Sequence, residues 1–212
     1  MEEVKIQEPF FNVTITGKIT LQSNQINNQI RSNIKENFIE KYKGKNFKNI
    51  GTIMQIYDMI GEVKGGKIQH ENVLSTAVFD VSFNCKICRP IKNTFITCVV
   101  KSINLKLIDL HAGSIIVTHR LQITDLINKD KFKMINDDKQ SVLYGYNESK
   151  AKLLKDDTKA WDKIVVGSYI KVKVLSFRIS NEQKNIICKG FLEQLSTDEE
   201  IKNYKEIENG DI

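Results

Sequence analysis

The sequence predicts an α+β protein, in which an N-terminal β-α-β-β domain of residues 1–89 precedes a C-terminal five-stranded barrel of residues 90–195 and an acidic tail of residues 196–212. Three observations predict this division. A strand-like run and a helix-like run follow one another near the N-terminus, and five short strand-like segments follow the pair Arg89-Pro90. Proline donates no hydrogen bond to a sheet, so this pair marks the end of the first domain. A chain of 212 residues that is 41% hydrophobic can also bury two small cores.

The first strand and the helix are read from hydrophobic spacing. Residues 10–21, FFNVTITGKITL, alternate apolar and polar side chains, as a half-buried strand does. Ser23 or Asn24 then offers a helix cap, and Gly44 is placed where a left-handed residue ends a helix. Between them, large apolar residues recur every four positions, which predicts one amphipathic helix: Ile26, Ile30, Ile34, Phe38 and Tyr42.

Two further strands complete the first domain. The runs NIGTIMQIYDMIGEV and GKIQHENVLSTAVFDVSFNCKICRP are strand-like and are interrupted at Gly61, Gly65 and Gly66. Glycine adopts positive φ without steric cost, so these residues predict a loop at the tip of a hairpin. The helix is then available to cover one face of the sheet.

Cys85 and Cys88 have the spacing of a zinc ligand pair, CxxC. In a strand, residues three apart point to opposite faces, which predicts Cys85 in the core and Cys88 outside it. A structural zinc site also needs further ligands, and no second CxxC or HxxxH is present. We therefore expect four reduced thiols, no metal and no cofactor.

Composition narrows the class of protein. The net charge of +6, with lysines dense between Lys129 and Lys189, suits either nucleic-acid binding or an ordinary solvated surface. No apolar run approaches the roughly 20 residues of a membrane span, and the N-terminus MEEVKIQEP is acidic. The expectation is a soluble protein of the cytosol or nucleus with no membrane partner. Phosphate-loop, Gly-x-Ser-x-Gly and HExxH motifs are absent, so no catalytic residues are predicted.

The second domain contains five short strand candidates: NTFITCVVKSIN, LKLIDLHAG, SIIVTHRL, GSYIKVKVLSFRI and NIICKGFL. Five strands that close on themselves make an OB-fold, a small barrel that commonly binds nucleic acid. A long polar insertion, residues 127–163, separates the third and fourth candidates, and its segment NESKAKLLKDDTKAW predicts a short surface helix. In the tail, Ser196 and Glu199 form a possible capping box, which leaves a terminal helix and disorder both open.

The order of these pieces resembles the larger stalk subunit of archaeal and eukaryotic multisubunit RNA polymerases, the family of eukaryotic subunit 7 and its archaeal counterpart. The resemblance covers roughly residues 8–195. VVGSYIKVKVLSFRI is similar to a barrel strand of that family, and YKGKNFKNIGTIMQIYDMIGEVKGGKIQHENVLSTAVFDVSFNCKICRPIKNTFITCVV is the most specific stretch. Within it, the matching positions are Gly44, Gly51, Gly61, Gly66, Arg89 and Pro90.

This resemblance implies a non-catalytic subunit. A tip loop containing Gly61, Gly65, Gly66 and Lys67 would dock at the base of the polymerase clamp against the largest subunit. A small helical stalk partner would pack alongside, and the barrel would face nascent single-stranded RNA. The bias toward Ile, Lys and Asn suits a large DNA virus, which would place the protein in cytoplasmic viral factories or virions; a protist nuclear subunit is the other source considered.

The sequence departs from the family in the second barrel strand. NLKLIDLHAGS lacks the family's glycine–aromatic pair, which weakens an inherited RNA site. Tyr169, Lys171 and Lys173 alternate along the fourth strand and are the replacement candidates for RNA stacking and phosphate contact, although a solvated outer face explains them as well. An independent OB-fold adaptor that binds RNA in decay or translation is the alternative function.

Overall fold

The computed structural model describes residues 6–68, 76–104, 106–120, 124–137, 140–148, 150–151, 160–180 and 184–209. The chain forms two compact units. The N-terminal unit comprises Phe11–Cys88 with Ser180–Lys184, and the barrel unit comprises Met1–Phe10, Arg89–Ile179 and Asn185–Ile212. In the part of the chain described here, no helix has the length and apolar character needed to cross a bilayer.

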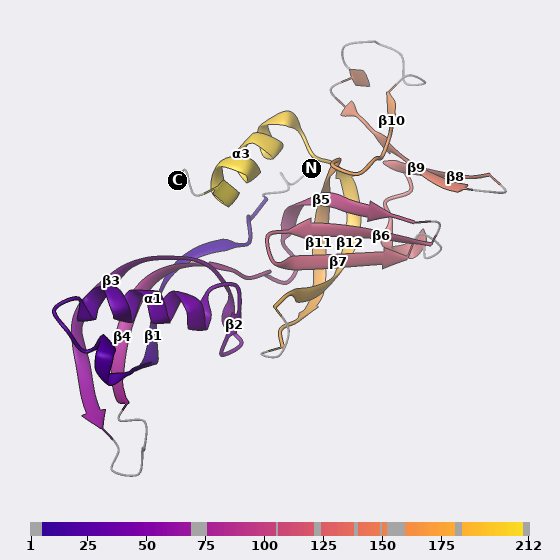
Figure 1. Cartoon of the computed structure of the whole chain (residues 1–212). Helices are drawn as coiled ribbons and strands as arrows, with labels where there is room; N and C mark the ends of the chain where they lie inside the picture. Colours follow the sequence, from indigo (N-terminus) through magenta and orange to yellow (C-terminus); the bar gives the residue numbers. More distant parts are fainter. Residues whose placement is uncertain are drawn as a thin grey trace. The chain divides into compact units, whose positions relative to one another are not determined.

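The N-terminal unit is a four-stranded sheet with a helix, α1, across one face (Figure 1). The strand order is β1-β4-β3-β2, and β4 is therefore an inner strand. Buried and exposed residues alternate along the second half of β1, as its sequence predicts. The elements are β1 (Phe10–Leu21), the short 3-10 turn η1 (Ser23–Gln25), α1 (Ile30–Tyr42), β2 (Asn46–Phe47), β3 (Gly51–Ile68) and β4 (Ala77–Cys88).

Helix α1 packs closely on the sheet. Ile34 and Phe38 are fully buried, and the Phe38 ring lies 4.3 Å from the Phe83 ring on β4. A Cβ atom on Gly17 of β1 would lie 3.1 Å from both Phe38 and Tyr42, so glycine at this strand position permits the close approach.

The helix boundaries differ from the prediction at one end. The helix begins at Ile30 rather than after Ser23 or Asn24, because a turn intervenes in which the backbone N–H of Gln29 donates to the Asn27 side chain at 2.8 Å. At the other end, Gly44 has φ +73°, which confirms its predicted left-handed conformation after the helix.

The cysteine prediction is half right. Cys85 is fully buried, and this burial raises the pKa of its thiol to about 11. Cys88 is also fully buried, so the prediction that it lies outside the core is wrong. The last four residues of β4 are all buried, at a corner of the sheet that Ser180 and Lys184 contact. The Asn46 side chain donates to the Ser180 carbonyl at 2.8 Å, and the hydroxyl of Thr52, the β3 partner of Cys88, donates to the Lys184 carbonyl at 3.4 Å. Among the described residues, no three His, Cys, Asp or Glu side chains are grouped as metal ligands.

The three glycines predicted to form a loop lie within β3. Gly61, Gly65 and Gly66 have φ values of +72°, +110° and +80°, and the pairing of β3 with β4 shifts register around them. The loop prediction is therefore wrong, since positive φ here serves bulges within a continuous strand. The segment that joins β3 to β4, residues 69–75, lies outside the described residues.

The barrel unit contains a closed five-stranded barrel, and each predicted strand segment supplies one strand. The order is β11-β12-β7-β6-β5, with β7 and β12 parallel and the other neighbours antiparallel. The strands are β5 (Phe95–Ile103), β6 (Leu107–Ala112), β7 (Ile115–Arg120), β11 (Tyr169–Arg178) and β12 (Ile186–Leu195).

The insertion between β7 and β11 forms a small antiparallel sheet, which the sequence did not predict. Its order is β10-β9-β8, with β8 (Phe132–Asp137), β9 (Gln140–Tyr146) and β10 (Trp161–Lys163) following the turn η2 (Thr124–Leu126). The predicted surface helix is seen only at residues 148, 150 and 151, and residues 152–159 lie outside the described residues.

The tail forms helix α3 (Asp198–Asn209), so the helical alternative is confirmed. Its capping box uses Thr197 and Glu200, one residue later than predicted. The Thr197 N–H donates to Glu200 Oε2 at 2.9 Å, and the Glu200 N–H donates to Thr197 Oγ1 at 3.4 Å. Tyr204 is almost fully buried, which shows that the helix packs on the barrel unit rather than extending from it.

Candidate functional site

The predicted RNA-binding residues of β11 lie beneath helix α3. Lys171 is only 4% exposed, and its Nζ lies 2.6 Å from Glu200 Oε1. The Tyr169 ring packs 6.1 Å from the Tyr204 ring, with Lys205 Nζ 5.5 Å from its centroid. The prediction that Lys171 is on a solvent-facing surface is therefore wrong, because the tail covers that strand.

Lys173 is partly exposed, as Tyr169 is, and its described ring contact is with the barrel rather than with α3. Its Nζ lies 5.6 Å from the Phe95 ring centroid, a cation–π contact within the barrel. The three residues are thus on one strand but not available together. RNA contact by Lys171 would require α3 to move away and break a buried ion pair.

A second carboxyl group lies near this ion pair. Glu8, in the segment before β1, is largely buried, and desolvation raises its pKa to about 7. The nearby carboxylates of Glu200 and Glu208 raise it further, while the Thr97 hydroxyl opposes the shift. The tail helix therefore packs over a polar cluster in which one lysine faces several carboxyl groups.

The raised pKa of Glu8 makes stability depend on pH. Below the unfolded pKa of about 4.5 both states are protonated; between about 4.5 and 7 only the folded state keeps the proton, so its stability falls as pH rises through this window. We expect Glu8→Gln to match the wild type near pH 4 and to exceed its free energy of unfolding by about 1–3 kcal/mol at pH 8. Urea unfolding at both pH values measures this. Glu36→Gln, at an exposed position of α1, is the control and should show no such pH-dependent gain.

The barrel also has exposed basic side chains on other strands, and these are called its basic side. Lys101, Lys106, Arg120 and Lys189 are all exposed, on or next to β5, β6, β7 and β12. Asp109 lies on β6, and its carboxylate accepts a hydrogen bond from the hydroxyl of Ser102 on β5 at 2.8 Å. Lysine and arginine side chains without aromatic neighbours suit contact with phosphates rather than base stacking.

Strand β3 exposes apolar side chains at two places: Ile68 lies at the far end of the β3–β4 hairpin, and Ile60 lies eight residues before it. Ile60 is 39% exposed and Ile68 is 59% exposed. A Cβ atom on Gly65 would lie 2.7 Å from the Val78 carbonyl oxygen, so this glycine lets the two strands approach closely. Gly61 and Gly66 lie on the same strand; the side chain of Lys67 is outside the described part of the chain.

The insertion sheet carries an aromatic and basic surface that was not predicted from the sequence. Trp161, Tyr146 and Tyr144 lie on neighbouring strands, and Lys133 Nζ is 4.0 Å from the Trp161 ring centroid. The signal was present as period-2 alternation in KFKMIND and QSVLYGY. It was overlooked because the polar composition of residues 127–163 was read as a loop with a helix.

Comparison with known proteins gives an informative relative. No family model matches the chain. A protein of Acanthamoeba polyphaga mimivirus, provisionally named a DNA-directed RNA polymerase subunit, is 27% identical over 210 residues. The match covers 97% of this chain and 95% of the relative, so it includes both compact units.

Proposed function

We propose that this chain is a non-catalytic stalk subunit of a multisubunit DNA-directed RNA polymerase encoded by a large DNA virus. The observation that carries the proposal is the end-to-end similarity to the mimivirus protein, which is named as a polymerase subunit. Because the match covers nearly the whole of both chains, it favours a relative that contains both compact units, rather than two proteins that share a single domain. Such a subunit acts in transcription wherever the virus assembles its polymerase, in cytoplasmic factories or in virions.

The connectivity of the barrel supports the assignment of an OB-fold. Around the barrel, the five strands follow the order β5, β6, β7, β12 and β11, which are the first, second, third, fifth and fourth along the chain. The third and fifth strands, β7 and β12, are parallel. This Greek-key closure is the arrangement of OB-fold barrels. The insertion sheet then occupies the connection between the third and fourth strands.

We assign polymerase docking to the end of the β3–β4 hairpin. The Ile68 side chain is exposed there, with exposed Ile60 farther back along β3, and both provide apolar area for a pocket on the largest subunit at the clamp base. A small helical stalk partner would bind elsewhere on the chain. In this arrangement the barrel presents its basic side, with Lys101, Arg120 and Lys189, to nascent RNA.

Affinity purification tests the polymerase assignment. A tagged chain isolated from cells in which its virus replicates should bring down the two largest polymerase subunits in near-equal molar amounts, measured by quantitative mass spectrometry. Recovery of the chain with factors of RNA decay or translation, and without polymerase subunits, would instead establish the adaptor function.

The same purification tests the docking surface. Ile68→Asp should reduce the recovery of polymerase subunits at least tenfold, because it places a charge in a desolvated contact. The isolated protein should unfold as the wild type does, since Ile68 is already 59% exposed. Ile26→Asp, at a 42% exposed position of the same unit, is the matched control. Equal recovery with Ile68→Asp and wild type would remove the hairpin end from the docking surface.

A further inference from the structure

We propose that the outward face of the β8-β9-β10 sheet is a binding surface for single-stranded nucleic acid, separate from the basic side of the barrel. This inference rests on the insertion alone and does not depend on the polymerase assignment. It is carried by the arrangement of aromatic rings and lysines on one face of a sheet whose other face is anchored to the barrel.

The inner face of the sheet is occupied. Phe132 and Leu143 are 4% and 2% exposed, and a Cβ atom on Gly145 would lie 2.7 Å from Leu195 Cγ on β12. Directly paired residues of an antiparallel sheet point to the same side, so Phe132 and its partner Gly145 define the face toward the barrel.

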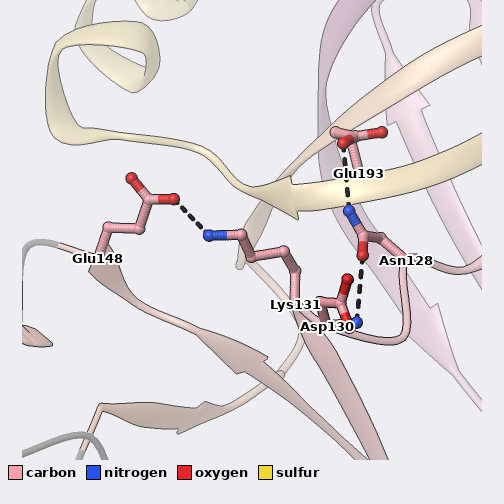
Figure 2. A network of polar contacts seen from close by, with 5 residues as sticks. All are labelled: Asn128, Asp130, Lys131, Glu148 and Glu193. Atoms are coloured by element: carbon pink, nitrogen blue, oxygen red, sulfur yellow. Dashed lines mark hydrogen bonds and ion pairs between the residues drawn. The ribbon is translucent and has the colours of Figure 1, made fainter. Parts of the chain in front are cut away.

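Polar contacts hold the base of the sheet against β12 (Figure 2). Asn128 donates from its side chain to Glu193 Oε1 at 3.2 Å, and its backbone N–H donates to the Leu192 carbonyl at 2.9 Å. Asn128 Oδ1 also accepts from the backbone N–H of Asp130 at 3.1 Å, which fixes the turn before β8. A face anchored in this way presents its outward side chains on a defined support.

The outward face carries three aromatic rings, of which Trp161 lies on β10 and Tyr146 and Tyr144 lie on β9. Trp161 pairs with Tyr146, and their ring centroids are 5.4 Å apart in an edge-to-face arrangement. Tyr144, two residues from Tyr146, points to the same side and pairs with both Lys163 and Lys133. All three rings are partly exposed.

Lysines lie over these rings. Lys133 Nζ is 4.0 Å from the Trp161 centroid, and Lys131 Nζ is 5.1 Å from the Tyr146 centroid. Lys131 is also paired with Glu148 at 2.6 Å, as Figure 2 shows. Within the described residues, Lys133 and Lys163 have no carboxylate partner and are exposed.

This combination fits a single strand. Bases stack on aromatic faces without regard to sequence, while lysines neutralise the phosphates between them. Lys133, which lies over the Trp161 ring, has no carboxylate partner among the described residues and can turn to a phosphate when a base takes its place on the ring. The excess of positive charge on this face favours an anionic ligand over a neutral or basic peptide, and the neighbouring aromatic rings favour stacked bases over an acidic peptide.

Trp161 is the sole tryptophan of the chain, so its fluorescence reports on this surface directly. Titration of the purified protein with oligo(U) at low salt should quench the Trp161 emission saturably. The concentration dependence should match that of the anisotropy of a labelled oligo(U). The double variant Lys133→Gln/Lys163→Gln should flatten the log–log salt dependence of binding by about 1.4, roughly 0.7 for each phosphate that is no longer neutralised. Trp161→Leu should weaken binding roughly 5- to 150-fold, and Trp161→Phe should restore most of it.

The matched control is Lys101→Gln/Lys189→Gln on the barrel, which should leave the Trp161 quench unchanged. The inference would be overturned if RNA did not quench Trp161 in the wild type and if only the barrel variant lost RNA binding. The proposed function would remain intact in that case. Absence of RNA binding at low salt would overturn it as well. So would a quench produced by polyglutamate or polyproline but not by oligo(U), since that would make the face a protein-docking surface.

Discussion

Lys171→Met is expected to lower the free energy of unfolding of the barrel unit by about 3–5 kcal/mol. The substitution keeps the apolar stem but removes the charge that faces Glu200 at 2.6 Å. Lys171 is buried and the Glu200 side chain is 19% exposed, so the carboxylate left without its partner carries a large part of the cost of desolvation. Here that cost rises further because Glu8 and Glu208 lie close enough to act on the same cluster.

Urea unfolding followed by the emission of Trp161 measures this loss, since that residue belongs to the barrel unit. Hydrogen exchange should accelerate across residues 198–209 as α3 loses its anchor. Lys173→Met is the control on the same strand and should cost under about 1 kcal/mol, because the side chain is half-exposed. Adding Glu200→Gln to Lys171→Met removes the unpaired charge but keeps an acceptor for the Thr197 N–H, and should recover part of the loss. A Lys171→Met protein as stable as Lys173→Met would mean that the ion pair does not hold α3.

Gly190→Val is expected to destabilise the barrel by about 3 kcal/mol or more. A Cβ atom at this position would overlap Val172 Cγ1 and would lie 3.1 Å from Val117 Cγ1, inside a closed barrel. Side chains of neighbouring strands fill that space, so a branched residue must displace them or push β12 outward.

The neighbouring position supplies the control for Gly190→Val. Lys189 lies on the same strand with its side chain exposed, and Lys189→Val should change the free energy of unfolding by about 0.5 kcal/mol or less. Both variants are measured by the same Trp161 unfolding curve. Equal stability of the two would contradict the closed barrel with β12 between β11 and β7.

Local hydrophobic period was sufficient to predict most of the strands. FFNVTITGKITL and the five barrel segments form strands. In each of them, apolar and polar residues alternate or apolar residues follow one another over the length of a single strand. The core positions of β4 up to Cys85 were predicted for the same reason. The outward-facing residues of a strand give no such signal about what covers them.

Two errors arose from contacts between distant parts of the chain, and a third arose from bulges within a strand. Lys171 looks solvent-facing within VVGSYIKVKVL, and its burial depends on a helix that begins 27 residues later and brings Glu200 to it. Cys88 is buried at a corner of the sheet where Asn46 and Thr52 donate to the carbonyls of Ser180 and Lys184, and no pattern in β4 reveals these contacts. Gly65 and Gly66 resemble turn residues in sequence, but a strand with bulges uses positive φ in the same way. The candidate site was affected most, because function was assigned to exposed side chains, whose exposure depends on these distant contacts.

Cross-linking mass spectrometry on the polymerase purified through the tagged chain tests the central claim most directly. Lys64, exposed on β3 near the end of the hairpin, should be linked to the largest subunit at the base of its clamp. These links should disappear with Ile68→Asp, while links within the chain persist. A purified chain that carries no polymerase subunit, or a polymerase whose links to this chain avoid the β3–β4 hairpin, would contradict the proposed stalk role.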